Sequence, residues 1–156
     1  MNIEVLPMSV NDLDELMKIE KVSFPTPWSK ESYLAELDNE VSVYRVIRLN
    51  GKLVGYGGMW QIVDEAHITN IAVHPDFRGQ GIGERLMEEL IGMAKQQRSI
   101  GITLEVRPSN QEALRMYSKM GFLPTAIRKG YYTDTNEDAL IMWKYLVVAK
   151  NMDLSK

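Results

Sequence analysis

The chain has 156 residues, of which 45% are hydrophobic and 25% charged, with a formal net charge of −3 and no cysteine. This size and composition predict one globular domain with a substantial core. They exclude a strongly basic surface for wrapping nucleic acid, and the lack of cysteine excludes disulfides, thiolate metal sites and cysteine nucleophiles.

The N-terminal segment lacks the basic and apolar regions of a signal peptide, and no apolar run approaches the ~18 residues of a membrane span. We therefore expect a cytoplasmic protein with no membrane partner. Residues 2–6 alternate in polarity and predict a short strand. Ser9 followed by Asp12 forms a capping-box pattern before a helix, which the prolines of "SFPTPW" (residues 23–28) end. Ser29 can cap a second short helix.

The middle of the chain predicts a hairpin and one further strand. Residues 41–49 and 52–63 are rich in strand-forming residues, and Asn50-Gly51 between them is the favoured two-residue hairpin turn. The segment "EAHITNIAV" (residues 65–73) predicts the next strand. Neither His67 nor His74 has a metal-binding spacing, so we expect no metal site. We expect a structural role for His67, with a place on the cleft face near the substrate as the alternative.

The second half of the chain alternates helices with strands. Apolar residues at helical spacing predict a helix that runs to about residue 98, and a strand follows over 102–107. Ser109 and Glu112 form a second capping-box pattern, which opens a helix that Gly121 stops. The strands of the final predicted hairpin are residues 122–132 and 138–146. The predicted fold class is α/β with one mixed sheet, in a single domain over 1–146, with a polar, frayed tail over 147–156.

The stretch Arg78–Gly83, "RGQGIG", places glycines at alternate positions before a helix N-terminus, whose free amides and dipole suit a phosphate group. A Walker A loop is excluded, because Glu84 and Arg85 stand where lysine and a hydroxyl residue are required. The dinucleotide fingerprint lacks its third glycine. However, Glu105 lies where that fold places an acidic residue, so the dinucleotide alternative stays open.

The same stretch matches the Q/R-x-x-G-x-G/A signature of the GNAT family of N-acetyltransferases. Residues 68–83, "ITNIAVHPDFRGQGIG", resemble the fourth strand and loop of that family, and residues 110–122, "NQEALRMYSKMGF", resemble a later helix that faces the cofactor. The resemblance covers about residues 1–146 and is greatest to the branch that acetylates the N-terminal alanine of a ribosomal protein. It implies the GNAT fold, a mixed and mostly antiparallel sheet flanked by about four helices, with acetyl-CoA as the cosubstrate.

The resemblance also implies which residues bind the cofactor. A strand would pair its backbone with the pantetheine arm, and the glycine-rich loop would surround the pyrophosphate at close backbone approach. Helix capping explains Asn110 nearly as well as cofactor contact does. The implied cofactor-binding residues are Ile71, Ala72, Val73, Arg78, Gly79, Gln80, Gly81, Ile82, Gly83, Glu84, Asn110 and Tyr117.

For acyl transfer to an amine, the resemblance implies Glu105 as general base and Tyr117 as general acid. A protonated amine cannot attack a thioester, so some group must take its proton, and the departing thiolate needs a proton in return. A solvated or ion-paired strand residue is the alternative for Glu105, and a core residue is the alternative for Tyr117. With no cysteine and no serine–histidine pairing, we expect direct transfer.

Phe24, Pro25 and Trp28 stand where related enzymes shape a peptide groove, although packing on the core explains them equally well. Tyr131 and Tyr132 stand where N-terminal acetyltransferases close over the acceptor. We therefore expect a protein N-terminal acetyltransferase, with the N-terminal alanine of a ribosomal protein as the leading acceptor. The alternatives are a family member that acetylates lysine side chains or small amines, and a non-catalytic module that binds acyl-CoA or a dinucleotide.

Overall fold

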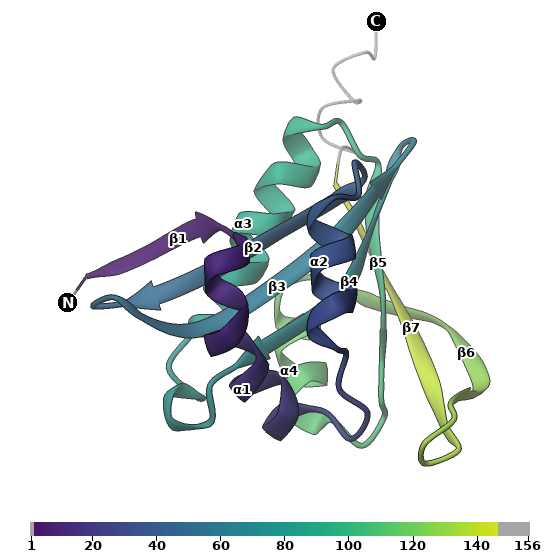
Figure 1. The fold of residues 1–156 in the computed structure, drawn as a ribbon. Coiled ribbons are helices and arrows are strands. Elements are labelled where there is room, and N and C mark those ends of the chain that lie inside the picture. Colours follow the sequence, from purple (N-terminus) through teal and green to yellow (C-terminus); the bar gives the residue numbers. More distant parts are fainter. Residues whose placement is uncertain (1, 147–156) are drawn as a thin grey trace, which may run out of the picture.

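The structure is a computed structural model that describes residues 2–146 (Figure 1). The strands are β1 (Ile3–Pro7), β2 (Ser42–Leu49), β3 (Lys52–Ile62), β4 (Glu65–Val73), β5 (Gly101–Val106), β6 (Leu123–Tyr132) and β7 (Glu137–Tyr145). The α-helices are α1 (Leu13–Ser23), α2 (Lys30–Leu37), α3 (Ile82–Gln96) and α4 (Gln111–Lys119), with 3-10 turns at Val10–Asp12 and Pro75–Phe77. The predicted tail over 147–156 lies outside the described residues.

All seven strands of residues 2–146 form one sheet in the order β1-β2-β3-β4-β5-β7-β6. Every neighbouring pair is antiparallel except β4 and β5, which are parallel. This arrangement confirms the predicted fold class. The β2–β3 turn is also as predicted, because Asn50 and Gly51 both have the positive φ angles, 52° and 85°, of a tight hairpin turn.

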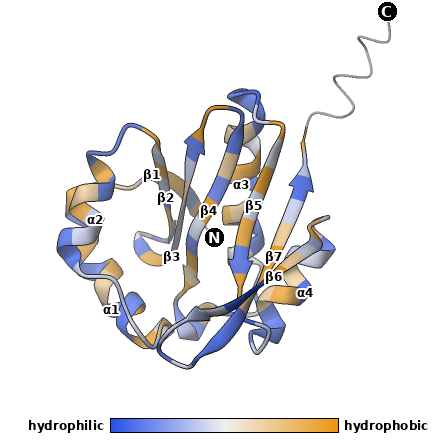
Figure 2. Cartoon of the chain, turned by 90° about the vertical axis from the view of Figure 1, so that its right-hand side faces the viewer, coloured by the Kyte–Doolittle hydropathy of each residue, from blue (hydrophilic) through white to orange (hydrophobic). Residues whose placement is uncertain are grey.

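The helices cover both faces of the sheet. Figure 2 shows α1 and α2 on one side and α3 and α4 on the other. On the first side, Leu13, Leu16 and Ile19 of α1 are buried in one core cluster. On the other side, Met87 and Leu90 of α3 belong to a second cluster that also holds residues of α4. Within the described residues, no helix is long and apolar enough to cross a membrane.

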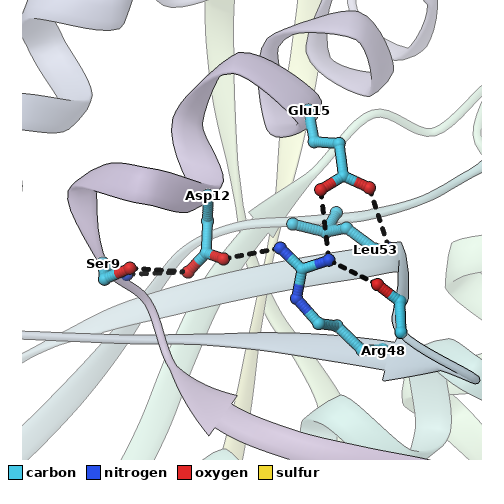
Figure 3. Close-up of polar contacts among 6 residues, drawn as sticks. Ser9, Asp12, Glu15, Arg48 and Leu53 are labelled. Carbon is cyan, nitrogen blue, oxygen red and sulfur yellow. Dashed lines mark hydrogen bonds and ion pairs between the residues drawn. The ribbon is translucent and has the colours of Figure 1, made fainter.

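A charged cluster holds the start of α1 against the β2–β3 hairpin (Figure 3). Arg48 donates to the carboxylate of Asp12 at 2.7 Å and to that of Glu15 at 3.1 Å. The Asp12 carboxylate also accepts from the backbone N–H of Ser9 at 2.8 Å, a contact that belongs to the predicted capping box. These contacts orient α1, whose last turn leads into the loop over residues 24–28.

The N-terminus of α4 differs from the sequence prediction. Asn110, not Ser109, is the N-cap, and its side-chain oxygen accepts from the N–H of Ala113 at 3.2 Å. Ser109 instead donates its backbone N–H to the carboxylate of Glu137 at 2.9 Å. Asparagine caps a helix as well as serine does, so the pattern of Ser109 with Glu112 did not decide between adjacent candidates.

The parallel pairing of β4 with β5 is short. It joins three residue pairs, Glu65 with Gly101, Ala66 with Ile102 and His67 with Thr103, and then the strands diverge. On its other side β4 stays paired with β3 as far as Val73. The later part of β4 therefore faces β5 with backbone groups that no strand of the described chain pairs. Such groups need water or a ligand as partner.

Candidate active site

A cleft of about 1000 Å³ opens where β4 and β5 diverge. Its walls are the strand segments 68–73 and 104–107, the glycine-rich loop, part of α4, the loop over 23–28 and residues 131–134. The cleft brings together every site residue expected from the sequence except Gln80, which is exposed and lies outside its walls. Residues far apart in the chain thus meet at one opening in the sheet.

The glycine-rich loop forms a concave end of this cleft. Gly79 and Gly81 have φ angles of 76° and 84°, which glycine adopts without strain. Gly81 is the N-cap of α3, so the free amides of the first turn lie beside the cleft. A Cβ atom on Gly83 would lie 3.2 Å from the sulfur of Met116, so glycine lets α3 approach α4 closely. This loop has the geometry of an anion site.

Charged side chains border the loop. Arg78 donates from Nε to the carbonyl of Val73 at 3.0 Å and from Nη2 to the hydroxyl of Ser23 at 3.2 Å. Glu84, in the first turn of α3, forms an ion pair with Lys119 of α4 at 3.1 Å. The guanidinium of Arg78 therefore connects the end of β4 to α1, and the Glu84–Lys119 pair connects α3 to α4.

Glu105 has a histidine partner that sequence analysis missed. Its Oε1 lies 2.8 Å from Nε2 of His67, and the two side chains are 13% and 32% exposed. Because His67 pairs with Thr103 in the β4–β5 register, and Thr103 and Glu105 share a strand face, the two side chains become neighbours. The register of the parallel strands, which the sequence does not show, was the missing signal.

Tyr117 reaches the cleft from α4, on the opposite face of the sheet from α1 and α2. Its side chain is 8% exposed, packs against Phe122 with ring centroids 5.7 Å apart, and lines the cleft. Burial raises the pKa of its hydroxyl to about 12, so the phenol is protonated at neutral pH. The ring of Tyr117 thus belongs to the core, and the same side chain lines the cleft.

Two of the chain segments that line the cleft contact each other. The hydroxyl of Thr26 donates to Asp134 at 3.1 Å, which joins the loop over 23–28 to the β6–β7 turn. Arg107 donates two hydrogen bonds to the same carboxylate, at 2.8 and 3.1 Å, and stacks over the ring of Tyr132 at 4.0 Å. Tyr131 and Glu105 both line the cleft, and burial together with the charge of Glu105 raises the pKa of the Tyr131 hydroxyl.

A buried carboxylate supports the loop over 23–28. Glu20 is 1% exposed and accepts from the hydroxyls of Tyr33 and Tyr56, each at 2.6 Å, and from the backbone N–H of Trp28 at 2.8 Å. Trp28 and Phe24 also pack on the core cluster beneath α1 while they line the cleft. The packing on the core is therefore confirmed, and the peptide-groove role stays a prediction for two residues that line the cleft. Among the described residues, no cluster of His, Asp and Glu could hold a metal ion.

Comparison with known proteins supports an acyl-transfer site. Residues 13–122 match the model of the acetyltransferase (GNAT) family. A Bacillus subtilis (strain 168) protein, provisionally named a ribosomal protein bS18-alanine N-acetyltransferase, is 46% identical over 87% of this chain and 91% of its own length. The enzyme of that name from Escherichia coli (strain K12) is 34% identical, over 86% and 92%. The crystal structure of the Escherichia coli enzyme matches with a TM-score of 0.85 and 33% identity, over 93% and 94% of the two chains.

Proposed function

The chain belongs to the acetyltransferase (GNAT) family, and on that premise we propose that it transfers the acetyl group of acetyl-CoA to the α-amine of a protein N-terminus. The acceptor we propose is the N-terminal alanine of ribosomal protein bS18, the acceptor in the names of the two sequence relatives. The observation that carries the proposal is that a free strand edge, an anion-binding loop and a candidate acid and base line one cleft.

Two parts of the cleft can bind two different parts of acetyl-CoA. Along Ile71, Ala72 and Val73, the strand edge that faces away from β3 has no strand partner among the described residues, and it can bind an extended amide chain such as the pantetheine arm, as an added strand would bind. The amides at the start of α3, next to Gly79 and Gly81, can bind the pyrophosphate. Bound acetyl-CoA would supply the thioester that the acceptor amine attacks.

Two side chains perform the proton transfers in this proposal. Glu105 takes the proton of the acceptor amine, directly or through one water, so that the amine nitrogen can attack. Tyr117 donates its hydroxyl proton to the sulfur as the carbon–sulfur bond breaks. Because burial keeps Tyr117 protonated, its proton is available at neutral pH. Glu105 and Tyr117 approach the cleft from opposite faces of the sheet, which leaves room for the reacting groups between them.

The walls of the cleft around Thr26 and Asp134 support a chain terminus as the acceptor. The hydrogen bond between Thr26 and Asp134 joins two wall segments, and the aromatic residues Trp28 and Tyr131 also line the cleft. An extended N-terminus can pass along these walls with its α-amine leading. The first residues of the acceptor would contact these rings, which supports selection by sequence.

The proposal is tested by following CoA release with a thiol reagent over a panel of short peptides. The panel varies the first residue and includes each peptide in an α-blocked form that carries a lysine. Turnover confined to peptides with a free N-terminus, highest for the bS18 sequence, is the expected result. Turnover on blocked lysine peptides would move the protein to another branch of the family. NAD binding without CoA binding would contradict the proposal altogether.

A further inference from the structure

We propose that His67 is a positioning residue, which holds the Glu105 carboxylate so that one oxygen faces the acceptor amine. The inference rests on the proposed function, because it assigns Glu105 as the base. It starts from the 2.8 Å contact between Nε2 of His67 and Oε1 of Glu105. An ionised carboxylate only accepts hydrogen bonds, so the imidazole donates from Nε2. Oε1 is then held by the imidazole, and Oε2, for which the described residues provide no hydrogen bond, is the oxygen we assign to the amine or a water.

The imidazole is itself held by a row of side chains that crosses the sheet. Trp60, the partner of His67 in the β3–β4 register, packs its ring nearly perpendicular to the imidazole, with centroids 5.8 Å apart. The indole N–H of Trp60 donates to Glu36 of α2 at 2.8 Å. Glu105 is therefore the last member of a row from α2 through β3 and β4 to β5. A base held in this way loses little conformational freedom in reaching its reactive geometry.

The location of His67 gives it this role rather than that of an ordinary strand residue. His67 forms the last β4–β5 pair before the strands diverge, and it lies behind Glu105, outside the walls of the cleft. The histidine therefore touches the base without occupying the space for substrate. Removal of its N–H should free the carboxylate to rotate, which slows proton transfer but leaves the cofactor-binding surfaces intact.

Two variants separate hydrogen bonding from packing. His67→Leu keeps a similar size without a donor, whereas His67→Gln keeps an N–H that can reach Glu105. We expect His67→Leu to lower kcat about tenfold with an unchanged KM for acetyl-CoA, and His67→Gln to stay within about threefold of the wild type. Equal rates for the two variants would overturn the proposal. If His67→Leu fails to fold, His67→Thr, whose hydroxyl is too short for the contact, takes its place with the same expectations.

A double-mutant cycle shows whether His67 acts through Glu105. In a Glu105→Gln background, His67→Leu should cause no further loss of kcat, because the base that it positions is gone. A full additional loss would mean that His67 acts by another route and would contradict the proposal. Thermal midpoints of all four proteins, measured in parallel, distinguish a catalytic effect from loss of structure.

A third measurement does not depend on acetylation. In protein labelled with ¹⁵N-histidine, the ring signals of His67 should report the Nε2–H tautomer and should shift in Glu105→Gln. The ring of His74, whose Nδ1 accepts from the N–H of Asp76, should not respond and is the internal control. An unshifted His67 would overturn the proposal. If the wild-type enzyme acetylates none of the peptides, the proposed function is contradicted instead. The ring signals would still show whether His67 donates a hydrogen bond to Glu105.

Discussion

Glu105 allows chemistry to be separated from binding by a single substitution. Glu105→Gln keeps the size of the side chain but removes its ability to take a proton. We expect kcat to fall by about 10²-fold to 10⁴-fold, with the dissociation constant of acetyl-CoA nearly unchanged, because Glu105 is the general base in the proposed reaction. Steady-state kinetics and calorimetric titration with acetyl-CoA measure the two quantities. An unchanged kcat at neutral pH would reject Glu105 as the essential base.

Tyr117 gives a complementary prediction, because its ring and hydroxyl have separate roles. Tyr117→Phe keeps the ring that packs against Phe122 and removes the proton donor. We therefore expect a thermal midpoint near that of the wild type and a kcat reduced by about 10²-fold. Thermal melts and CoA-release rates on the same preparation check both expectations. A wild-type rate in Tyr117→Phe would leave Tyr117 with its core role only.

At the scale of elements, the start of α4 combines a capping function with a proposed binding function. Asn110→Ala removes the cap and should cost about 1 kcal/mol of stability, whereas Asn110→Ser should keep the cap. We also propose that the Asn110 amide contacts acetyl-CoA, as the family resemblance implies, and we expect both variants to raise the KM for acetyl-CoA, because neither alanine nor serine carries that amide. Melting curves and KM measurements on Asn110→Ala and Asn110→Ser test the two functions separately. A normal KM in Asn110→Ser would assign Asn110 to capping alone.

The elements were predicted well because their signals are local. The Asn50-Gly51 turn, the glycine-rich loop and the alternation of Glu105 with its neighbours each depend on residues a few positions apart. The contacts that complete the site are not local. His67 and Glu105 are 38 positions apart, and Thr26 and Asp134 are 108 apart. Such pairs depend on strand order and register, which one sequence does not reveal. The capping box assigned to Ser109 and Glu112 was wrong for a different reason, since two good capping residues are adjacent, and the capping interpretation of Asn110 was confirmed.

At the scale of the whole molecule, buried tyrosines make stability depend on pH in the alkaline range. Burial raises the pKa of Tyr33, Tyr44 and Tyr56 above the ordinary value of 10.0, and raises that of Tyr117 and Tyr132 to about 12. Between pH 10 and pH 12 the unfolded chain loses phenolic protons that the native chain keeps. The contribution of these tyrosines to the free energy of unfolding is therefore highest below pH 10 and falls as the pH rises above it.

The size of this effect can be measured by thermal melts from pH 8 to pH 11.5. For a buried residue such as Tyr117, the free energy of unfolding should fall by about 1.4 kcal/mol per pH unit above pH 10. Tyr131 and Tyr145 are exposed in the folded chain, so it is the larger part of the tyrosinate absorbance, from the other five tyrosines, that should appear together with unfolding. A midpoint that stays constant from pH 9 to pH 11.5 would contradict the burial of these hydroxyls.

The divergence of β4 from β5 also bears on self-association. Strand edges invite pairing with other chains, which is a common route to aggregation, and proteins protect such edges at the rims of their sheets. Here the edge of Ile71, Ala72 and Val73 that faces away from β3 lies inside the sheet, with β5 and α4 forming the opposite wall of the cleft. A slender ligand can reach that edge, whereas a strand of another protein, with side chains on both faces, meets those walls. The cleft therefore leaves the hydrogen-bonding groups of this β4 edge accessible to a narrow ligand but not to a strand of another protein.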